Sequence, residues 1–590
     1  MSSFSNFHFP VTLNFQQLPN PNFISSTTTT TTRLYSQLQH HQHRSTLVYS
    51  FNQLLHQNNP TPSIIQFGKI LGSLVKLNHY STVVSLHQQM EFKGISSNLV
   101  TLNILINCFS QLGEISLSFS VFANILKKGF QPDLITFNTL IKALCLKGQT
   151  RAALQLLRRV DGKLVQPNVV MYNTVIDGMC KDKLVNDAFH LYSEMIAKRI
   201  SPDVVTYNTL INGFCIVDRL IEAIDLFNKM ISENIDHSIY TFNILVDAFC
   251  KKGKVKETNN VLVVMMKKGV KPDVVTYNSL MDGYCLVKKV NKAKDIFNTM
   301  AQMGVTPNVR SYNIMINGFC KIKMLDEAMN LFNEMHCTKV IPNVVTYNSL
   351  MDGYCLVKKV NKAKDIFNTM AQMGVAPDVQ SYNIMINGFC IVDRLKEAID
   401  LLNKMMRKGV KPNVVTYNSL MDGYCLVKKV DKAKDIFNTM AQMGVAPDVQ
   451  SYNTMINGFC KIKMVDEAMN LFNEMHCTKV IPDVVTYNTL IDGLCNVGRL
   501  EDAIEIFKDI LVKGYNLNVY TYTVIIKGFC IKGMFDEALA VLSIMEENGC
   551  IPDAKTYETI ISSLLKTGEN DKAEKLLREM IVRGVPYDQN

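Results

Sequence analysis

The chain has 590 residues, of which 47% are hydrophobic and 19% are charged, and its formal net charge is +10. This length is several times that of one ordinary globular domain, and the composition excludes a collagen-like or largely disordered chain. No run of 18 consecutive apolar residues occurs, so the sequence predicts no membrane span. The positive charge favours an anionic partner, but only weakly at this length.

The first 63 residues differ in composition from the rest of the chain. They are rich in Ser, Thr, Asn and Gln, and the first acidic residue is Glu91. A Ser/Thr-rich start without acidic residues is typical of an organellar transit peptide. The tetrapeptide RLYS at 33–36 resembles a mitochondrial processing site, with cleavage after Tyr35. We therefore expect 1–63 to be a transit peptide and disordered region that directs the protein to the mitochondrion, with the chloroplast as the second choice. A disordered polar tail is the alternative.

From Ile64 onward the sequence repeats itself every 35 residues. Residues 274–305 and 344–375 are identical, and 414–445 differs from them only at Asp431. Self-similarity at a fixed period indicates stacked structural repeats, and the near-identical copies indicate duplication of a pair of repeats. Fifteen repeats occupy 64–588 without insertions, starting at residues 64, 99, 134, 169, 204, 239, 274, 309, 344, 379, 414, 449, 484, 519 and 554.

Each repeat predicts two helices. In the repeat 484–518, apolar residues recur at intervals of three and four over 487–494 and again over 500–510, and the sequence Asn-Val-Gly at 496–498 separates the two runs. Gly514 ends the second helix, and in many repeats a Pro follows three residues after this Gly. An Asp, Asn or Ser after the Pro can cap the next helix. A single helix pair cannot bury its apolar faces alone, so the repeats predict an all-α solenoid with a continuous core and a long concave surface.

Twelve cysteines occupy the twelfth position of successive repeats, from Cys145 to Cys530. None has a CxxC partner or a His at the spacing of a metal site, so the sequence predicts no metal ligands here. We expect each Cys to be a small buried residue where helices touch.

The recurring phrase V-[TS]-Y-N-x-L-[IM]-x-G-[FLY]-C, the 35-residue period and the ending G-x-x-P-[DN] resemble the pentatricopeptide repeat family over 64–588. The Trp-Leu-Gly-Tyr pattern of tetratricopeptide repeats is not seen. Equal repeat lengths resemble the P-type subfamily, and the segments 61–95 and NDKAEKLLREMI resemble the restorer-of-fertility-like group of plant mitochondrial proteins. The resemblance implies a right-handed α-solenoid superhelix of fifteen 35-residue helix-turn-helix repeats.

The resemblance also implies that each repeat binds one base of single-stranded RNA, and that the N-terminal repeats face the RNA 5′ end. In each repeat the second residue would pack against the base, and the fifth and last residues would read its edge. The fifth residues are Asn103, Asn138, Asn173, Asn208, Asn243, Asn278, Asn313, Asn348, Asn383, Asn418, Asn453, Asn488 and Thr523. The last residues are Asp133, Asn168, Asp203, Ser238, Asp273, Asn308, Asn343, Asp378, Asn413, Asp448, Asp483, Asn518 and Asp553. The second residues are Val100, Ile135, Val170, Val205, Tyr240, Val275, Arg310, Val345, Val415, Val485 and Tyr520, while Gln380, Gln450 and Lys555 depart from this apolar or stacking pattern.

Hydrogen-bonding chemistry makes these pairs plausible readers of pyrimidines. Uracil offers an N3–H donor that suits an Asp acceptor, whereas cytosine offers a bare N3 that suits Ser or Asn. Thr at position five leaves room for a purine. Repeats two to fourteen then predict the target 5′-UYUCUYYUYUUYG-3′, where Y is either pyrimidine. The first repeat (Gly68, Asn98) and the last (Glu558, Asp588) do not fit this pairing and are expected to cap the stack.

Three other interpretations stay open at this point. Asp, Asn and Ser are the preferred helix N-caps, so the last residues could be caps alone, with the fifth Asn a solvated first-turn residue. The solenoid could instead be a protein–protein scaffold without RNA specificity. An enzyme is a third possibility, but the paired acids at 325–327 and 466–468 recur where acidic residues favour the dipole of the second helix.

We therefore expect a non-enzymatic protein that acts in organellar transcript processing or expression. It is expected to have no catalytic residues, metal or cofactor, and its partner is single-stranded organellar RNA. A recruited endonuclease would be needed for any cleavage. We expect no membrane association and favour a monomer.

Overall fold

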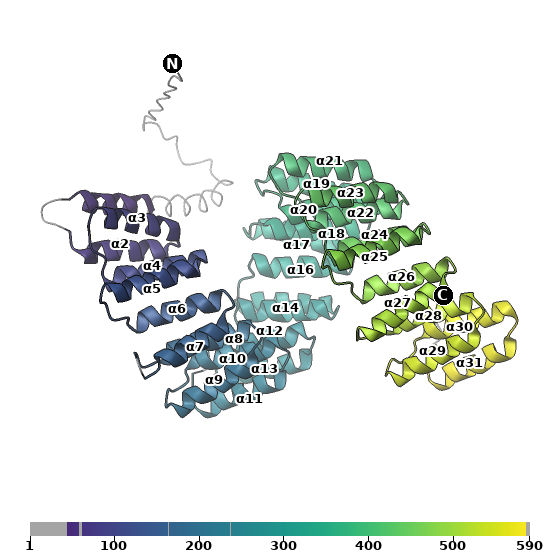
Figure 1. The fold of residues 1–590 in the computed structure, drawn as a ribbon, viewed down its shortest axis with the longest axis horizontal. Helices are drawn as coiled ribbons and strands as arrows, with labels where there is room; N and C mark the ends of the chain where they lie inside the picture. Colours follow the sequence, from purple (N-terminus) through teal and green to yellow (C-terminus); the bar gives the residue numbers. More distant parts are fainter. Residues whose placement is uncertain (1–43, 58–61, 163, 237, 586–590) are drawn as a thin grey trace, which may run out of the picture. The chain divides into compact units, whose positions relative to one another are not determined.

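The computed structural model describes residues 44–57, 62–162, 164–236 and 238–585, and these are predominantly helical (Figure 1). Helices α2 to α31 form fifteen consecutive pairs, one for each predicted repeat, so the predicted all-α solenoid of helix-turn-helix repeats is confirmed. The described ranges contain no β-strand beyond an isolated bridge between Asp161 and Val165. The expected cleavage site after Tyr35 lies outside the described residues.

The first helices of the pairs begin at the repeat boundaries found in the sequence. They are α2 (Ile64–Lys76), α4 (Leu99–Leu112), α6 (Leu134–Leu146), α8 (Val169–Lys181), α10 (Val204–Ile216), α12 (Ile239–Lys251), α14 (Val274–Leu286), α16 (Val309–Lys321), α18 (Val344–Leu356), α20 (Val379–Ile391), α22 (Val414–Leu426), α24 (Val449–Lys461), α26 (Val484–Asn496), α28 (Val519–Ile531) and α30 (Ala554–Thr567).

The second helices follow after a short turn. They are α3 (Tyr80–Phe92), α5 (Ile115–Lys127), α7 (Thr150–Val160), α9 (Val185–Ala197), α11 (Leu220–Ser232), α13 (Val255–Lys267), α15 (Val290–Gln302), α17 (Leu325–Cys337), α19 (Val360–Gln372), α21 (Leu395–Arg407), α23 (Val430–Gln442), α25 (Val465–Cys477), α27 (Leu500–Val512), α29 (Phe535–Glu547) and α31 (Asn570–Val582).

The last residue of one repeat fixes where the first helix of the next repeat begins. Asp133 has extended backbone, and its Oδ1 accepts a hydrogen bond of 2.8 Å from the backbone N–H of Thr136. In return the backbone N–H of Asp133 donates to the Thr136 hydroxyl. This reciprocal capping box recurs before α10, α20 and α26, among others. Each such cap stabilises its helix by about 1 kcal/mol, so the last residues have a structural role whatever else they do.

Small residues let neighbouring first helices approach closely. The tenth residue of many repeats is Gly, and it lies against the twelfth-position Cys of the preceding repeat. A Cβ on Gly458 would come within 2.5 Å of Sγ and 3.3 Å of Cβ of Cys425. Burial raises the pKa of the Cys425 thiol to about 12. The twelve cysteines at the twelfth position of their repeats are buried or half-buried, which confirms their predicted place at helix contacts.

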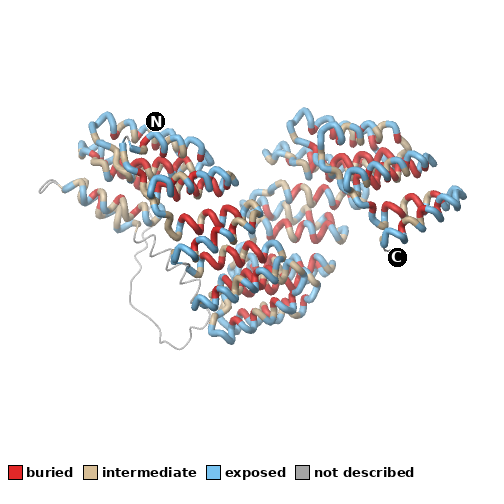
Figure 2. Tube along the Cα trace, turned by 90° about the horizontal axis from the view of Figure 1, so that it is seen from below, coloured by how far each residue is buried: buried red, intermediate tan, exposed pale blue. Residues whose placement is uncertain are grey.

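The chain divides into an N-terminal unit, 1–248 with 261–270, and a C-terminal unit, 249–260 with 271–590. Within each unit the buried residues line the facing sides of stacked helices (Figure 2). Aromatic pairs join successive repeats in this core, as where the rings of Phe437 and Tyr452 meet edge to face with centroids 5.1 Å apart. In the described part of the chain, no helix is long and apolar enough to cross a membrane.

One helix precedes the first repeat, in a segment where the composition predicts disorder. Residues 44–56 are helical, Phe51 is fully buried, and its ring meets Phe67 edge to face at 5.0 Å. Arg44 donates a hydrogen bond to the Thr82 hydroxyl. The expectation of disorder is therefore wrong for this part of 1–63. The apolar residues at 47, 48, 51, 54 and 55 carry a helical period that a judgement from composition overlooks.

Candidate nucleic-acid interface

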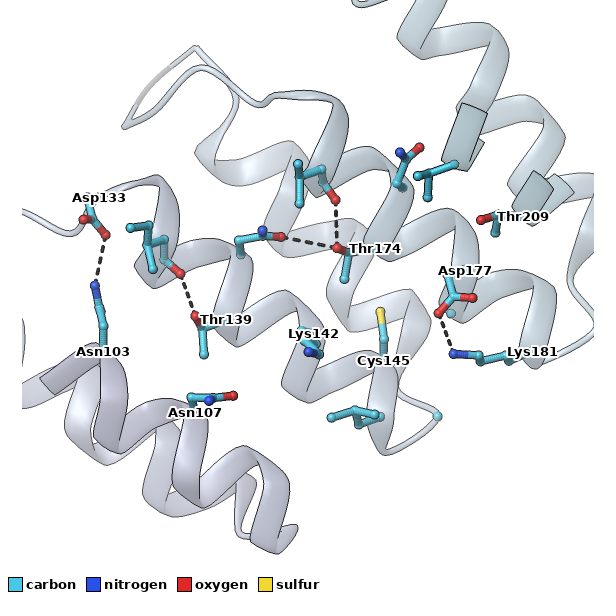
Figure 3. Close-up of a pocket in the computed structure, with 18 of the residues that line it drawn as sticks. Asn103, Asn107, Asp133, Thr139, Lys142, Cys145, Thr174, Asp177, Lys181 and Thr209 are labelled. Carbon is cyan, nitrogen blue, oxygen red and sulfur yellow. Dashed lines mark hydrogen bonds and ion pairs between the residues drawn. The ribbon is translucent and has the colours of Figure 1, made fainter. Parts of the chain in front are cut away.

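Within each unit, first helices of neighbouring repeats line an open groove. In the N-terminal unit, α4, α6, α8 and α10 surround a cavity of about 1020 Å³, and Figure 3 shows the side chains that line it. Its lining includes predicted second, fifth and last residues, among them Val100, Asn103, Asp133, Ile135, Asn138, Val170, Asn173, Asp203 and Val205. A second cavity, of about 640 Å³ in the C-terminal unit, has Asp378, Gln380, Asn383, Asn413 and Val415 in its lining. The structure thus brings the predicted residues of adjacent repeats together on one surface.

The second residues form a row of exposed apolar side chains. Val100 is 60% exposed, Ile135 64% and Tyr240 61%, and the other apolar members of the set are at least 45% exposed. Arg310, Gln380 and Gln450 are exposed in the same way. Because these apolar side chains are exposed, they contribute little to the packing of the core. They are available to pack against the flat face of a ligand.

The fifth residues are buried or half-buried. Asn103 is 7% exposed and Asn348 4% exposed, and Asn138, Asn313 and Asn418 are half-buried. The alternative of a solvated first-turn residue is therefore wrong. A buried amide needs hydrogen-bond partners, which the structure supplies from the next repeat.

Two side chains of the second repeat and one of the third form a compact cluster. Nδ2 of Asn103 donates to Oδ1 of Asp133 at 3.2 Å (Figure 3), and the Thr136 hydroxyl donates to Oδ1 of Asn103 at 2.8 Å. A carboxylate only accepts hydrogen bonds, so the amide nitrogen must face Asp133 and the amide oxygen must face the hydroxyl. The cluster therefore fixes which way the Asn103 amide points. In the fourth repeat Asn173 and Asp203 are joined in the same way, at 2.9 Å.

One oxygen of each clustered Asp is used by the protein, and the other is not. Oδ1 of Asp133 accepts from the backbone and hydroxyl of Thr136 and from Asn103, whereas Oδ2 makes no hydrogen bond to the described residues. Partial burial alone would raise the pKa of Asp133, but these hydrogen bonds outweigh it and hold the pKa below its usual range. The pKa of Asp203, Asp378 and Asp483 is lowered by the same balance. Each is an ionised acceptor at neutral pH.

Where the last residue is Asn, the same cap presents the opposite group. Oδ1 of Asn413 accepts from the backbone N–H of Thr416 at 3.2 Å, which leaves Nδ2 as a donor. Asp and Asn at this position are therefore equivalent as caps but present an acceptor and a donor, respectively. The cap role is a structural fact, and it uses only one of the two terminal atoms.

Comparison with known proteins identifies the fold family. The PPR repeat family model matches residues 97–146, 167–216, 202–251, 237–286, 272–321, 311–356, 342–391, 379–426, 412–461, 447–496, 482–531 and 524–566. The PPR repeat model matches 135–163 and 555–585. Together these matches cover well over half of the sequence. The chain belongs to the pentatricopeptide repeat family.

Curated relatives of this pentatricopeptide repeat protein share short stretches with it. A mitochondrial pentatricopeptide repeat-containing protein of Arabidopsis thaliana is 52% identical over 52 residues, which is 9% of this chain and 10% of the relative. Another from the same plant, also named mitochondrial, is 42% identical over 59 residues, or 10% of this chain and 9% of the relative. Each alignment thus spans about a tenth of the relative's length.

Among solved structures, maize pentatricopeptide repeat protein PPR10 has the same fold. It is 22% identical with a TM-score of 0.57, over 88% of this chain and 79% of PPR10. PPR10 in complex with an 18-nt psaJ RNA element gives a TM-score of 0.55 at 22% identity, over 92% of this chain and 84% of that one.

Two kinds of residue in this pentatricopeptide repeat protein were not predicted from the sequence as part of the site. The third residue is Thr or Ser in almost every repeat, and this regularity was the available signal for its contact with the preceding repeat. Lys142 and Lys181 also line the larger cavity, where Lys181 pairs with Asp177 at 2.6 Å. In the described ranges, no group of three or more His, Cys, Asp or Glu side chains could hold a metal ion.

Proposed function

We propose that this chain is a sequence-specific single-stranded RNA-binding protein that reads one base per repeat. The observation that carries the proposal is the pair of polar groups that recurs from repeat to repeat, in most repeats beside an exposed apolar side chain. A helix cap alone requires neither the buried Asn at position five nor the exposed Val at position two. A protein–protein scaffold would not require the same polar pair in successive repeats.

The chemistry of the pair favours pyrimidines. The fifth Asn keeps one N–H available for an oxygen of the base, and the last residue of the same repeat faces the neighbouring part of that base's edge. An Asp acceptor complements the N3–H of uracil, whereas an Asn or Ser donor complements the bare N3 of cytosine. Thr523, with Asp553 as the last residue of its repeat, leaves space for guanine. The proposed target remains 5′-UYUCUYYUYUUYG-3′, bound with its 5′ end at the second repeat.

The RNA backbone requires cations near the groove. Lys142 and Lys181 lie beside the reading residues of the N-terminal unit and can attract phosphate. The chain as a whole has an excess of ten positive charges. Affinity should therefore fall as the salt concentration rises, because phosphate contacts release counterions.

We place this activity in the mitochondrion, in transcript processing or expression. The names of the Arabidopsis relatives and the acid-free N-terminal sequence support this location. The restorer-of-fertility-like resemblance supports a role in which the bound transcript is cleaved or its expression blocked. Cleavage would be carried out by a recruited endonuclease.

Gel-shift titration at a stated salt concentration tests the proposal. The protein is titrated against the target oligonucleotide, its complement and a shuffled pyrimidine control. Tight binding to the target and weak binding to the complement are expected. Equal binding to all three RNAs would indicate that the protein binds polyanions without sequence specificity. No binding to any of them would favour a protein–protein scaffold.

A further inference from the structure

The third residue of a repeat contacts the reading Asn of the repeat before it. Its hydroxyl donates to Oδ1 of that Asn at 2.6–2.8 Å in seven repeats, which we call closed. The pairs are Thr136 with Asn103, Thr206 with Asn173, Thr346 with Asn313, Ser381 with Asn348, Thr416 with Asn383, Ser451 with Asn418, and Thr486 with Asn453. The contact forms whether the last residue is Asp or Asn.

Four other repeats are open, because the amide oxygen of their reading Asn lacks this contact. The partner position for the third repeat is Met171, which has no hydroxyl, and within the described ranges Oδ1 of Asn138 accepts only a long bond of 3.4 Å from Thr174. The partner positions of the fifth, seventh and thirteenth repeats hold Thr241, Ser311 and Thr521, but among the described residues Oδ1 of Asn208, Asn278 and Asn488 is buried without a hydrogen-bond partner. Closed and open repeats therefore occur in one chain with the same Asn at position five.

We propose that the third residue is a positioning residue: its hydroxyl orients the Asn amide of the repeat before it and so helps to determine which base that repeat selects. This inference rests on the proposed function. In a closed repeat the hydroxyl holds the Asn oxygen inward, so the only group the amide can turn to a base is N–H. An open amide can turn its oxygen outward as well. The reading unit is then three residues, and one of them comes from the next repeat.

Adenine is the base whose binding should differ most between closed and open repeats. Uracil, cytosine and guanine each carry a carbonyl oxygen that an amide N–H can reach, whereas adenine carries none and offers an amine donor instead. The ring nitrogens of adenine can still accept from the amide N–H, but they lie deeper in the ring than an exocyclic oxygen, so closed repeats should disfavour adenine relative to the pyrimidines. Open repeats should tolerate it better, because an outward amide oxygen can accept from that amine. The third repeat should therefore select its base less strictly than its closed neighbours, the second and fourth repeats.

Met171 allows the hydroxyl to be added rather than removed. Met171→Thr supplies the hydroxyl, and Met171→Val supplies the same shape without it, so the two variants share any packing defect. RNAs that carry cytosine, uracil or adenine at the second base of the target are compared by equilibrium binding. Met171→Thr should raise the pyrimidine-over-adenine preference at this base roughly 3- to 10-fold above Met171→Val, with the other bases unchanged.

Thr136 gives the reverse experiment. Thr136→Val should lower the preference at the first base by a similar factor, and Thr136→Ser should keep it, because Ser381 and Ser451 make the same contact at 2.7 and 2.8 Å. Circular dichroism reports any loss of folding from the capping box. Equal preferences for the Thr and Val variants at position 171, with selectivity intact at other bases, would overturn this inference alone. Loss of selectivity at every base in the unmodified protein would overturn the proposed function instead.

Discussion

Ser238→Asp tests the reading of bases and the hydrogen-bond cluster together. Oδ1 of Asn208, in the fifth repeat, and Oγ1 of Thr241, in the sixth, are both buried without a hydrogen-bond partner among the described residues. The equivalent atoms of Asn173, in the fourth repeat, and Thr206, in the fifth, are bonded to each other at 2.7 Å, and both residues also bond Asp203. An Asp at 238 should draw Asn208 and Thr241 into the same arrangement.

Two measurable effects follow from this change. Each buried polar atom left unpaired costs about 1–3 kcal/mol. Because Ser and Asp are similar caps, most of the gain comes from pairing these atoms, and we expect the free energy of unfolding to rise by about 1–3 kcal/mol. The new carboxylate also replaces a hydroxyl that suits cytosine with an acceptor that suits uracil. The preference at the fourth base should move from C toward U by about 1–3 kcal/mol, or roughly 5- to 150-fold.

Ser238→Asn is the matched control. It can form the same cap and cluster, so its stability should rise as well, but its outward amide nitrogen should keep cytosine. The assay is equilibrium binding to RNAs that differ only at the fourth base, together with urea unfolding of each variant. If both variants kept the same base preference, the distinction between outward oxygen and outward nitrogen would be refuted.

Three further predictions concern packing, thiols and pH. Gly458→Ala should lower the free energy of unfolding by about 1–3 kcal/mol, because its Cβ would meet Sγ of Cys425; adding Cys425→Ala should recover part of this loss in urea unfolding, and no recovery would contradict the contact. A thiol reagent at pH 8 should label Cys337 and Cys477 quickly, since both are exposed. Cys320, Cys390 and Cys425 should react slowly, because burial raises the pKa of each thiol to about 12. Rapid labelling of these three, detected by mass spectrometry, would contradict their burial. Folding lowers the pKa of Asp133, Asp203, Asp378 and Asp483. Their contribution to stability is therefore full above the unfolded Asp pKa of about 4 and is lost as the pH falls through the lower folded values. Urea unfolding from pH 7 to pH 3 should show the free energy of unfolding decline only at the acid end, and a decline that began near pH 6 would point to other groups.

The repeat boundaries and helix pairs could be predicted from the sequence because the same pattern occurs fifteen times. A single run such as 487–494 is ambiguous by itself, but agreement at every 35th residue removes the ambiguity. The helix at 44–56 lies outside the period, so composition dominated its interpretation. Phe51 and Phe67 contact each other only in the fold, and local composition does not report such contacts.

The positions of the reading residues could be predicted, but their orientations could not. Asn103 and Thr136 are 33 residues apart, and only the stacking of repeats brings them to 2.8 Å. Thr136 is the capping-box partner of Asp133, and its second contact, with Asn103, depends on how closely α4 and α6 pack. For the same reason Asn208 and Asn173 look alike in sequence although their amide oxygens have different surroundings.

The most direct test of base reading by this chain is its affinity for 5′-UYUCUYYUYUUYG-3′ compared with every single-base variant of that RNA at one salt concentration. The account predicts that affinity falls at each changed base according to the fifth and last residues of the facing repeat, with C preferred at the fourth base and G at the last. Equal affinity for all the variants, or an order unrelated to those residues, would contradict it.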